Sequence, residues 1–593
     1  MALFNKRFRM NYHRPLAASL LIALVVGIAV GAETPALADR AGHPNVLLIC
    51  VDDLRPELGC YGAAHVRSPN IDRLANSGVT FDRCYVQVAV CNPSRASTFT
   101  GIRPDRLGVW TLPVHFREAS PNAVTLPQHL SRHGYVCEGF GKIFHNPWQD
   151  PRSWTSPHRW GQGSFTHYTD EQKDFTRQVK ESLPTGDWRK ENLRGLISNA
   201  PEIEDDEHPD GDMTRIVAER LAELSEQDEP FFLAVGYVLP HLPWCPPKRW
   251  WDQYDRSQLP LAENPNPPTG APPVALGDNY ELSHYADMTN MPTPLDPGLS
   301  EAEARRFRHA YYAAVSFVDA QIGRLLQTLR DNQLADDTIV VLWSDHGWKL
   351  GEHNAWGKMT NFEIDTRIPL LIYDPRAAGN GERCSQIIES LDLYPTLCEL
   401  TGTPIPSDVD GKSAAHLLSD PTAAHAGVAF SQYVRDRMMG RAIRTDRWRY
   451  VEWRTLADAE LKHRELYDQE NDPGENHNVV EQHPEIAAKL KKSLDEVLVP
   501  RPISLVPAIH SAAGGKKMQV RWANEYEGPV RITWISPRGE RRVQIDLKQG
   551  ESRQIGSFVG HRFAVESEDG KYHEVVEVTP DQDRIPIGRT SAK

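Results

Sequence analysis

The chain lacks an excess of positive charge. Its 593 residues include 66 Lys and Arg against 80 Asp and Glu, which gives a formal net charge of −14. Nonspecific nucleic-acid affinity comes largely from phosphate neutralisation by Lys and Arg, so this balance excludes a simple nucleic-acid binder. Cysteine is also scarce. Eight cysteines in a chain of this length are too few for a disulfide scaffold. With 40% hydrophobic residues, the chain still has enough apolar surface for packed domains.

The N-terminal segment has the order of a secretory signal. Basic residues come first, an apolar run extends from Leu16 to Ala32, and Ala36-Leu37-Ala38 is a small-residue cleavage pattern. The run, of about 17 residues, is at the short edge of what spans a bilayer. We expect a signal peptide over residues 1–38, with an uncleaved anchor as the alternative. The mature protein would then be secreted or periplasmic, with no membrane association.

Three apolar runs have the pattern of strands buried on both faces of a parallel sheet. Polar residues follow each run: Asp52 and Asp53 after 45–51, His241 after 231–237, and Asp345 and His346 after 338–343. A helical pattern fills residues 302–329. Ligands bind at the carboxyl ends of strands in doubly wound sheets. The pattern therefore predicts an α/β fold with a site at this edge.

Changes of pattern along the chain predict three segments after the signal. These are a catalytic α/β domain over 39–400, a smaller C-terminal α+β subdomain over 401–500, and a β-sandwich over 501–593. The sandwich is predicted from six short strand patterns separated mostly by Gly-containing turns: 518–522, 530–535, 542–547, 554–558, 562–565 and 573–578. Residues 146–210 and 255–300 lack clean periodicity, and we interpret them as long loops, which are usually functional.

The most specific motif is Cys91-Asn92-Pro93-Ser94-Arg95, which continues to Thr100-Gly101. A Cys followed by Pro two residues on and Arg four residues on resembles the signature of the type I sulfatases. Flanking patterns extend the resemblance from residue 43 to 497, and those around Lys142 and Lys358 are similar to the iduronate-2-sulfatase-like branch. The resemblance implies an alkaline-phosphatase-like fold, a mixed, mostly parallel sheet sandwiched by helices.

The resemblance also implies the chemistry. In this family a maturation enzyme oxidises the Cys to formylglycine, and the hydrated aldehyde hydrolyses sulfate esters through a covalent sulfo-enzyme intermediate. We expect Cys91 to be that residue. Attack by a thiol would leave a thiosulfate-like adduct, whereas a geminal diol uses one hydroxyl to attack sulfur and the other to expel sulfate. A buried structural thiol is the alternative for Cys91.

A metal site is predicted where the strands end. Packed carboxylates repel one another unless a cation lies among them, and oxygen-rich sites suit Ca²⁺ or Mg²⁺. By resemblance, one Ca²⁺ ion is held by Cys91 together with the four residues that follow two of the strands: Asp52, Asp53, Asp345 and His346. Many family members have Asn in place of His346, which makes a softer metal more plausible here, and the iduronate-2-sulfatase-like branch shares the His.

The remaining candidates are cations and an aromatic residue. Arg95 is suited to donate in a planar fork to the diol or the sulfate. By resemblance, Lys142 and Lys358 hold sulfate oxygens. His145 takes the proton when sulfate is released, and His241, which also contacts the substrate, protonates the leaving oxygen. Trp348 either lines a sugar-binding subsite or packs in the core.

The tail and the overall function leave alternatives. The tail resembles the β domain of the von Hippel-Lindau tumour suppressor at Trp534, Ser557 and His561, but Gln544 and Phe563 depart from its aromatic pocket. We favour an accessory module there, with substrate or peptide binding as the alternative. The leading function is a sulfatase acting on a sulfated sugar. The alternatives are a phosphonate or phosphate ester hydrolase of the same superfamily, or a carbohydrate- or peptide-binding protein.

Overall fold

The computed structural model describes residues 43–146, 149–503, 505, 515–536, 541–568, 572–580 and 582–588. The predicted signal peptide lies outside the described residues. Among the helices of the described part, none is long and apolar enough to cross a bilayer. All eight cysteines belong to the described residues, and each carries a free thiol rather than a disulfide.

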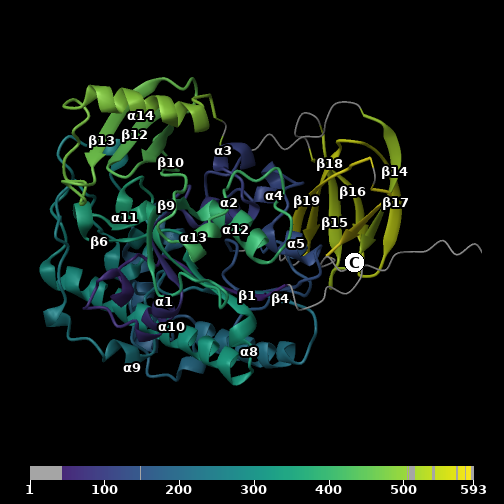
Figure 1. Cartoon of the computed structure of the whole chain (residues 1–593), viewed down its shortest axis with the longest axis horizontal. Coiled ribbons are helices and arrows are strands. Elements are labelled where there is room, and N and C mark those ends of the chain that lie inside the picture. Colours follow the sequence, from purple (N-terminus) through teal and green to yellow (C-terminus); the bar gives the residue numbers. More distant parts are fainter. Residues whose placement is uncertain are drawn as a thin grey trace, which may run out of the picture. The chain divides into compact units, whose positions relative to one another are not determined.

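A seven-stranded mixed sheet forms the centre of the catalytic part (Figure 1). The strands lie in the order β3 (Val136–Gly141), β4 (Phe231–Tyr237), β1 (Asn45–Val51), β5 (Thr338–Ser344), β8 (Arg367–Tyr373), β2 (Val79–Tyr85) and β9 (Arg383–Glu389). The first four run parallel, and β8 is antiparallel to both of its neighbours. This confirms the predicted mixed, mostly parallel sheet.

Alternate residues of β1 enter two separate cores, because successive side chains of a strand point to opposite faces. Leu47 and Ile49 join the core under α1 (Pro69–Ser77), α8 (Pro209–Ser225) and α10 (Glu301–Asp331). Val46 and Leu48 join the core under four other helices: α2 (Cys91–Thr100), α5 (Leu126–Ser131), α12 (Leu393–Leu400) and α13 (His416–Ser419). Figure 1 shows α8 and α10 below β1 and β4, with α2 and α12 above them. The sheet is therefore sandwiched by helices, as predicted.

One of the two predicted loop regions contains a regular helix. α6 (Asp170–Ser182) begins at a capping box in which Thr169 Oγ1 accepts from the backbone N–H of Gln172 at 3.3 Å. The Gln172 side chain accepts from Thr169 N–H at 2.9 Å. None of the helix residues is buried, and with Phe175 and Val179 as its only apolar residues the helix has no extended apolar stripe. Residues 255–300 instead form irregular chain with short 3-10 turns: Arg256–Gln258, Pro273–Ala275, Leu282–His284 and Ala286–Met288.

An antiparallel sheet and a helix lie within residues 429–497. The sheet has the order β10 (Ala429–Arg435), β11 (Met438–Arg444), β12 (Trp448–Thr455) and β13 (Leu461–Asp468). Helix α14 (Pro484–Val497) packs on it, with Leu490 and Leu494 in one core with Ile443 and Tyr450. The sheet and its helix agree with the predicted α+β architecture, whereas the domain boundaries stay a prediction.

The tail contains two facing sets of strands around a core that includes Trp522 and Phe563. One sheet has the order β17 (Ser552–Phe558), β14 (Lys517–Asn524) and β20 (Arg584–Ile587). The other has the order β16 (Arg541–Leu547), β15 (Val530–Ile535), β18 (Arg562–Ser567) and β19 (His573–Glu577). All six predicted strands are present, and the short β20, which contains Pro586, was not predicted.

Candidate active site

Polar residues from four neighbouring strands converge at one edge of the central sheet. Because β3, β4, β1 and β5 are adjacent and parallel, their carboxyl ends meet. The residues that follow them are Lys142 and His145 after β3, His241 after β4, Asp52 and Asp53 after β1, and Asp345 and His346 after β5. Cys91 is the first residue of α2, and Lys358 follows the short strand β7 (Trp356–Gly357). The structure thus brings the predicted ionisable residues to one place.

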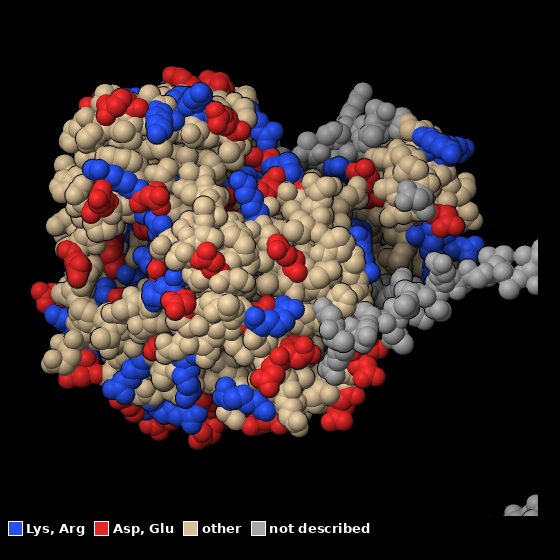
Figure 2. Space-filling model, viewed as in Figure 1, with Lys and Arg blue, Asp and Glu red and all other residues tan. Residues whose placement is uncertain are grey.

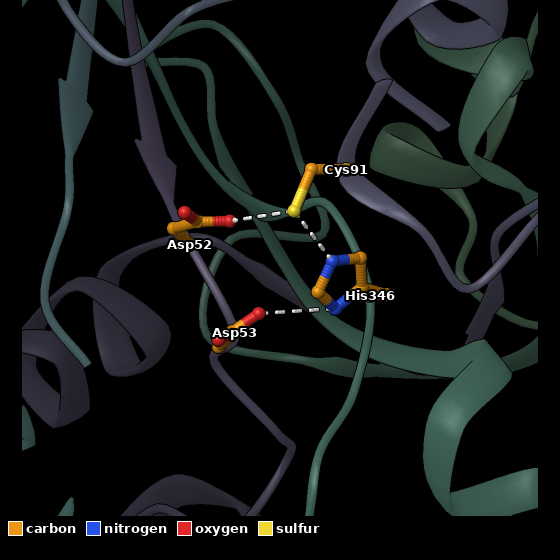
Figure 3. A group of neighbouring side chains, drawn as sticks. All are labelled: Asp52, Asp53, Cys91 and His346. Atoms are coloured by element: carbon orange, nitrogen blue, oxygen red, sulfur yellow. Dashed lines mark hydrogen bonds and ion pairs between the residues drawn. The ribbon is translucent and has the colours of Figure 1, made fainter. Parts of the chain in front are cut away.

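Four of these side chains form a compact group that fits a metal ion (Figure 3). Asp52, Asp53, Cys91 and His346 each offer one atom, and these atoms lie within 4.8 Å of one another. His346 Nδ1 is 3.1 Å from the Gly347 carbonyl oxygen, so we assign its proton to Nδ1. The lone pair on Nε2 then faces the Cys91 sulfur, 3.2 Å away.

The second aspartate carries the clearest sign of a cation. Asp53 Oδ2 is buried and accepts no hydrogen bond from the described residues. Burial raises the pKa of Asp53 above its ordinary value, although Lys358 opposes the rise. A buried carboxylate oxygen without a partner is costly. A divalent cation with oxygen preference, bound by this group, would remove that cost.

Arg95 donates hydrogen bonds to the carboxylates of Asp345 and Asp52. Its Nε donates to Asp345 Oδ2 at 2.8 Å, and its Nη2 donates to Asp52 Oδ1 at 3.2 Å. Nη1 donates to the backbone carbonyl oxygens of Lys142 and Ile143. The side chain is completely buried. The predicted fork is therefore directed at protein carboxylates and carbonyls, and it fixes the positions of two predicted metal ligands.

Cys91 is the first residue of α2, where backbone N–H groups favour an anion. Its sulfur is 3.3 Å from Lys358 Nζ and 3.6 Å from Asp52 Oδ1. Burial, followed by the charge of Asp52, raises the pKa of the thiol well above its ordinary value in spite of Lys358. The unmodified thiol therefore stays protonated at neutral pH, and a protonated thiol is a poor nucleophile.

Two buried lysines flank Cys91. Lys358 Nζ lies 2.7 Å from Asp53 Oδ1, and Lys142 Nζ is ion-paired with Asp52. Burial alone would lower the pKa of Lys358, but Asp53, Cys91 and other acidic neighbours hold it well above its usual value. Both lysines are thus cationic groups near residue 91, where they suit an anionic substrate group.

The two predicted histidines have opposite surroundings. Burial, followed by Lys142, lowers the pKa of His145 to about 3, so its imidazole is neutral. His241 Nδ1 lies 2.6 Å from the Leu242 carbonyl oxygen, and its Nε2 lies 3.2 Å from Glu281 Oε1. Both neighbours of His241 are acceptors, so each ring nitrogen faces a hydrogen-bond acceptor. One histidine is therefore suited to accept a proton and the other to donate one.

Glu281 is a site residue that was not predicted from the sequence, and it lies in the loop between α9 (Lys248–Trp251) and α10. Its carboxylate contacts His241 through Oε1 and lies 3.6 Å from Lys358 Nζ through Oε2. Although burial favours the neutral acid, Lys358 and His241 hold the pKa of Glu281 well below its ordinary value. The only sequence signal was its position in a long loop without periodicity, which does not single out a residue.

Trp348 lies in the core rather than on a sugar-binding surface. Its side chain is completely buried. The ring lies 6.3 Å from that of Trp244 at 81°, and Lys358 Nζ lies over it at 5.3 Å. This corrects the subsite interpretation in favour of packing, since a fully buried ring cannot touch a sugar. Trp348 instead supports Lys358 from beneath through a cation–π contact.

The charge of the site contrasts with that of the surface. On the face shown in Figure 2, acidic and basic side chains are interspersed. At the sheet edge, Arg95, Lys142 and Lys358 are each at most 8% exposed and lie beside carboxylates. Buried charges are screened much less than exposed ones, so this group sets the field that a bound anion experiences.

Comparison with known proteins identifies the class. The family model described as sulfatase matches residues 44–403, and a model described as N-sulphoglucosamine sulphohydrolase, C-terminal, matches residues 351–499. The chain therefore belongs to the sulfatase family and is a sulfuric ester hydrolase. Human iduronate 2-sulfatase is 32% identical over 528 residues, which cover 77% of this chain and 95% of that protein.

Two solved structures share the fold. A phosphonate monoester hydrolase of Agrobacterium radiobacter superposes with a TM-score of 0.58 at 24% identity, covering 76% of this chain and 95% of that one. A protein solved in complex with its substrate D-glucosamine-2-N,6-O-disulfate superposes with a TM-score of 0.59 at 22% identity, covering 77% and 97%. At this level of identity, the similarity establishes the fold.

Proposed function

We propose that the protein is a Ca²⁺-dependent formylglycine sulfatase that removes a sulfate ester from a carbohydrate, in the manner of the iduronate-2-sulfatase-like branch. The observation that carries the proposal is the position of Cys91, at the start of α2 among two carboxylates, His346 and Lys358. A residue there reaches both the metal-binding group and the cations that suit a sulfate.

Residue 91, oxidised and hydrated, is the nucleophile in this proposal. The raised pKa of the Cys91 thiol argues against a thiolate mechanism, and a diol can both attack sulfur and expel sulfate. Lys142 and Lys358 hold the sulfate oxygens as negative charge moves during transfer. Arg95 keeps Asp52 and Asp345 in place through its hydrogen bonds.

Proton transfers are assigned to the two histidines. His241 donates the proton of Nε2 to the leaving alcohol oxygen, and Glu281, 3.2 Å from the same nitrogen, orients the ring. His145, whose pKa of about 3 keeps it neutral, accepts the proton of the second hydroxyl as residue 91 releases sulfate. The different surroundings of the two rings support these opposite roles.

The ligands proposed for the metal are Asp52, Asp53, residue 91, Asp345 and His346. The orphaned oxygen of Asp53 and the oxygen-rich group fit Ca²⁺. The ion would neutralise the carboxylates and polarise bound oxygens. The Nδ1–H of His346, held by the Gly347 carbonyl, orients its Nε2 toward this position.

The substrate and setting are inferred more broadly. A sulfated mono- or oligosaccharide is the proposed substrate, by similarity to iduronate 2-sulfatase. We also propose export from the cytoplasm, guided by residues 1–38, and activation by a formylglycine-generating enzyme. In the tail, the rings of Trp534 and His561 lie 5.3 Å apart, and Ser557 Oγ lies 3.3 Å from His561 Nδ1. With Phe563 buried in the core, an accessory role remains our proposal for this module.

Two measurements test the function together. Mass spectrometry of the peptide containing residue 91, from protein expressed with the maturation enzyme, should show an aldehyde in place of the thiol. Matured enzyme should hydrolyse members of a panel of sulfated saccharides, and Cys91→Ala should lose activity by roughly a thousandfold or more while keeping its melting temperature. An unmodified thiol in an active preparation, or faster turnover of phosphonate monoesters than of every sulfate ester, would contradict the proposal.

A further inference from the structure

Two exposed aromatic side chains from separate loops stack on each other near the active site. Trp188 directly precedes α7 (Arg189–Asn192), and Tyr280 directly precedes Glu281. Their ring centroids lie 5.1 Å apart with 25° between the planes, and the residues are 42% and 50% exposed. The ring of His284 completes the group, 4.7 Å from Trp188 and 4.6 Å from Tyr280. We term these three side chains the aromatic ledge.

The segment Asn279–Glu281 connects the ledge along the chain to the active site. Glu281 contacts both His241 and Lys358, at 3.2 and 3.6 Å. Asn279 Oδ1 accepts from the backbone N–H of Trp356 at 2.7 Å, two residues before Lys358. Since consecutive Cα atoms are about 3.8 Å apart, Tyr280 lies next to a residue that contacts the proposed proton donor and a proposed sulfate-binding lysine.

Hydrogen bonds hold the two loops of the ledge together. The backbone N–H of Arg194 donates to the His284 carbonyl oxygen at 2.7 Å. Within the first loop, the Asn192 side chain donates to the Trp188 carbonyl oxygen at 2.8 Å. Arg189 donates to the Thr289 carbonyl oxygen, which joins α7 to the second loop. The exposed rings therefore rest on a tethered support, which lowers the entropic cost of binding to them.

The chemistry of the ledge suits a sugar ring. The apolar C–H face of a pyranose can cover an aromatic ring, while its hydroxyl or acidic groups remain available to polar partners. Arg194 is exposed beside the ledge and donates to the Tyr285 hydroxyl at 3.3 Å, so a cation is present for an anionic sugar. Exposed apolar patches with polar margins mark binding sites.

We propose that the aromatic ledge binds the sugar unit adjacent to the sulfated one, so that the enzyme favours sulfated oligosaccharides over monosaccharides. The proposal rests on the proposed function, because it takes the site beside Glu281 as the place where the sulfate ester is cleaved. It adds a second recognition site from the two loops that the sequence left without an assigned role.

The test compares a sulfated monosaccharide with a tetrasaccharide that ends in the same sulfated unit. Trp188→Ala and Tyr280→Ala should each lower kcat/KM for the tetrasaccharide about tenfold more than for the monosaccharide. Trp188→Phe, which keeps an aromatic face, should restore most of the difference. The matched control is Phe175→Ala, since Phe175 on α6 is also 42% exposed, and it should leave the ratio within about twofold of wild type.

Binding is measured separately from turnover, by calorimetric titration of the same two saccharides into Cys91→Ala protein with and without Trp188→Ala. If Trp188→Ala lowers the affinity for the tetrasaccharide more than that for the monosaccharide, the result supports the ledge. This holds even if the matured enzyme hydrolyses no sulfate ester of the panel, because that second result contradicts the proposed function alone. If the ratio of tetrasaccharide to monosaccharide affinity is unchanged by Trp188→Ala, or if Phe175→Ala lowers it equally, the ledge is not a sugar subsite.

Discussion

Replacing Glu281 with glutamine tests the proposed acid most directly. The substitution keeps the shape of a side chain that is 19% exposed and removes only its charge. A hydrogen bond to a charged group contributes about 1.5–3 kcal/mol, and a neutral one contributes about 0.5–1.5 kcal/mol. We therefore expect Glu281→Gln to cost about 1–2 kcal/mol of transition-state stabilisation, a fall of roughly five- to thirtyfold in kcat/KM on a sugar sulfate.

The assay compares two leaving groups. A sugar alcohol needs a proton as it departs, whereas a nitrophenolate leaves readily as an anion, so an effect through His241 should be much smaller on 4-nitrophenyl sulfate. In a double-mutant cycle, Glu281→Gln should add little to His241→Gln. Equal losses on both substrates, or additive effects in the double variant, would refute the role of Glu281 in positioning the acid.

Two further predictions concern stability. Ca²⁺ at about a hundred times its Kd should stabilise the folded protein by about 2.7 kcal/mol, seen as a rise in melting temperature that Asp53→Asn abolishes; no rise in the wild type would count against the ion. Glu352 is buried, and Arg55 and Arg308 overcome the effect of burial and lower its pKa from 4.5 to about 2. Because this carboxylate has a depressed folded-state pKa, its contribution is complete above the unfolded value and is lost as the pH falls from about 4.5 to 2. Glu352→Gln should therefore lower the melting temperature near neutrality and flatten the acid limb of its pH profile, and an unchanged acid limb would contradict this assignment.

The strand-end residues were predictable because two rules apply to them at once. Asp52 and Asp53 directly follow a continuous apolar run, Asp345 and His346 follow another after Ser344, and parallel strands deliver such residues to a common edge. The register of β1 with β5 pairs Val51 with Ser344, so these pairs of polar residues begin at the same level. For these positions, local pattern and topology agree.

Glu281 and the aromatic ledge were not predictable for a physical reason. Glu281 is 40 residues from His241 and 77 from Lys358 along the chain, and no local periodicity relates them. The irregular segment that carries it is fixed by individual contacts, such as that of Asn279 with the Trp356 backbone. The helix α6 was missed differently: its capping box at Thr169 and Gln172 was visible, but Phe175 and Val179 are its only apolar residues and do not make an apolar stripe.

The net charge of −14 does not describe what a sulfate ester meets at the sheet edge. Three cationic side chains face four carboxylates there: Arg95, Lys142 and Lys358 against Asp52, Asp53, Asp345 and Glu281. These side chains alone leave one negative charge in excess. Because the site has little access to solvent, that charge interacts strongly with a nearby ion. One divalent cation reverses the sign. A sulfate ester is an anion, so the ion that binds the unpartnered oxygen of Asp53 also makes the charge of the site favourable to substrate. Metal binding should therefore affect substrate affinity as well as turnover.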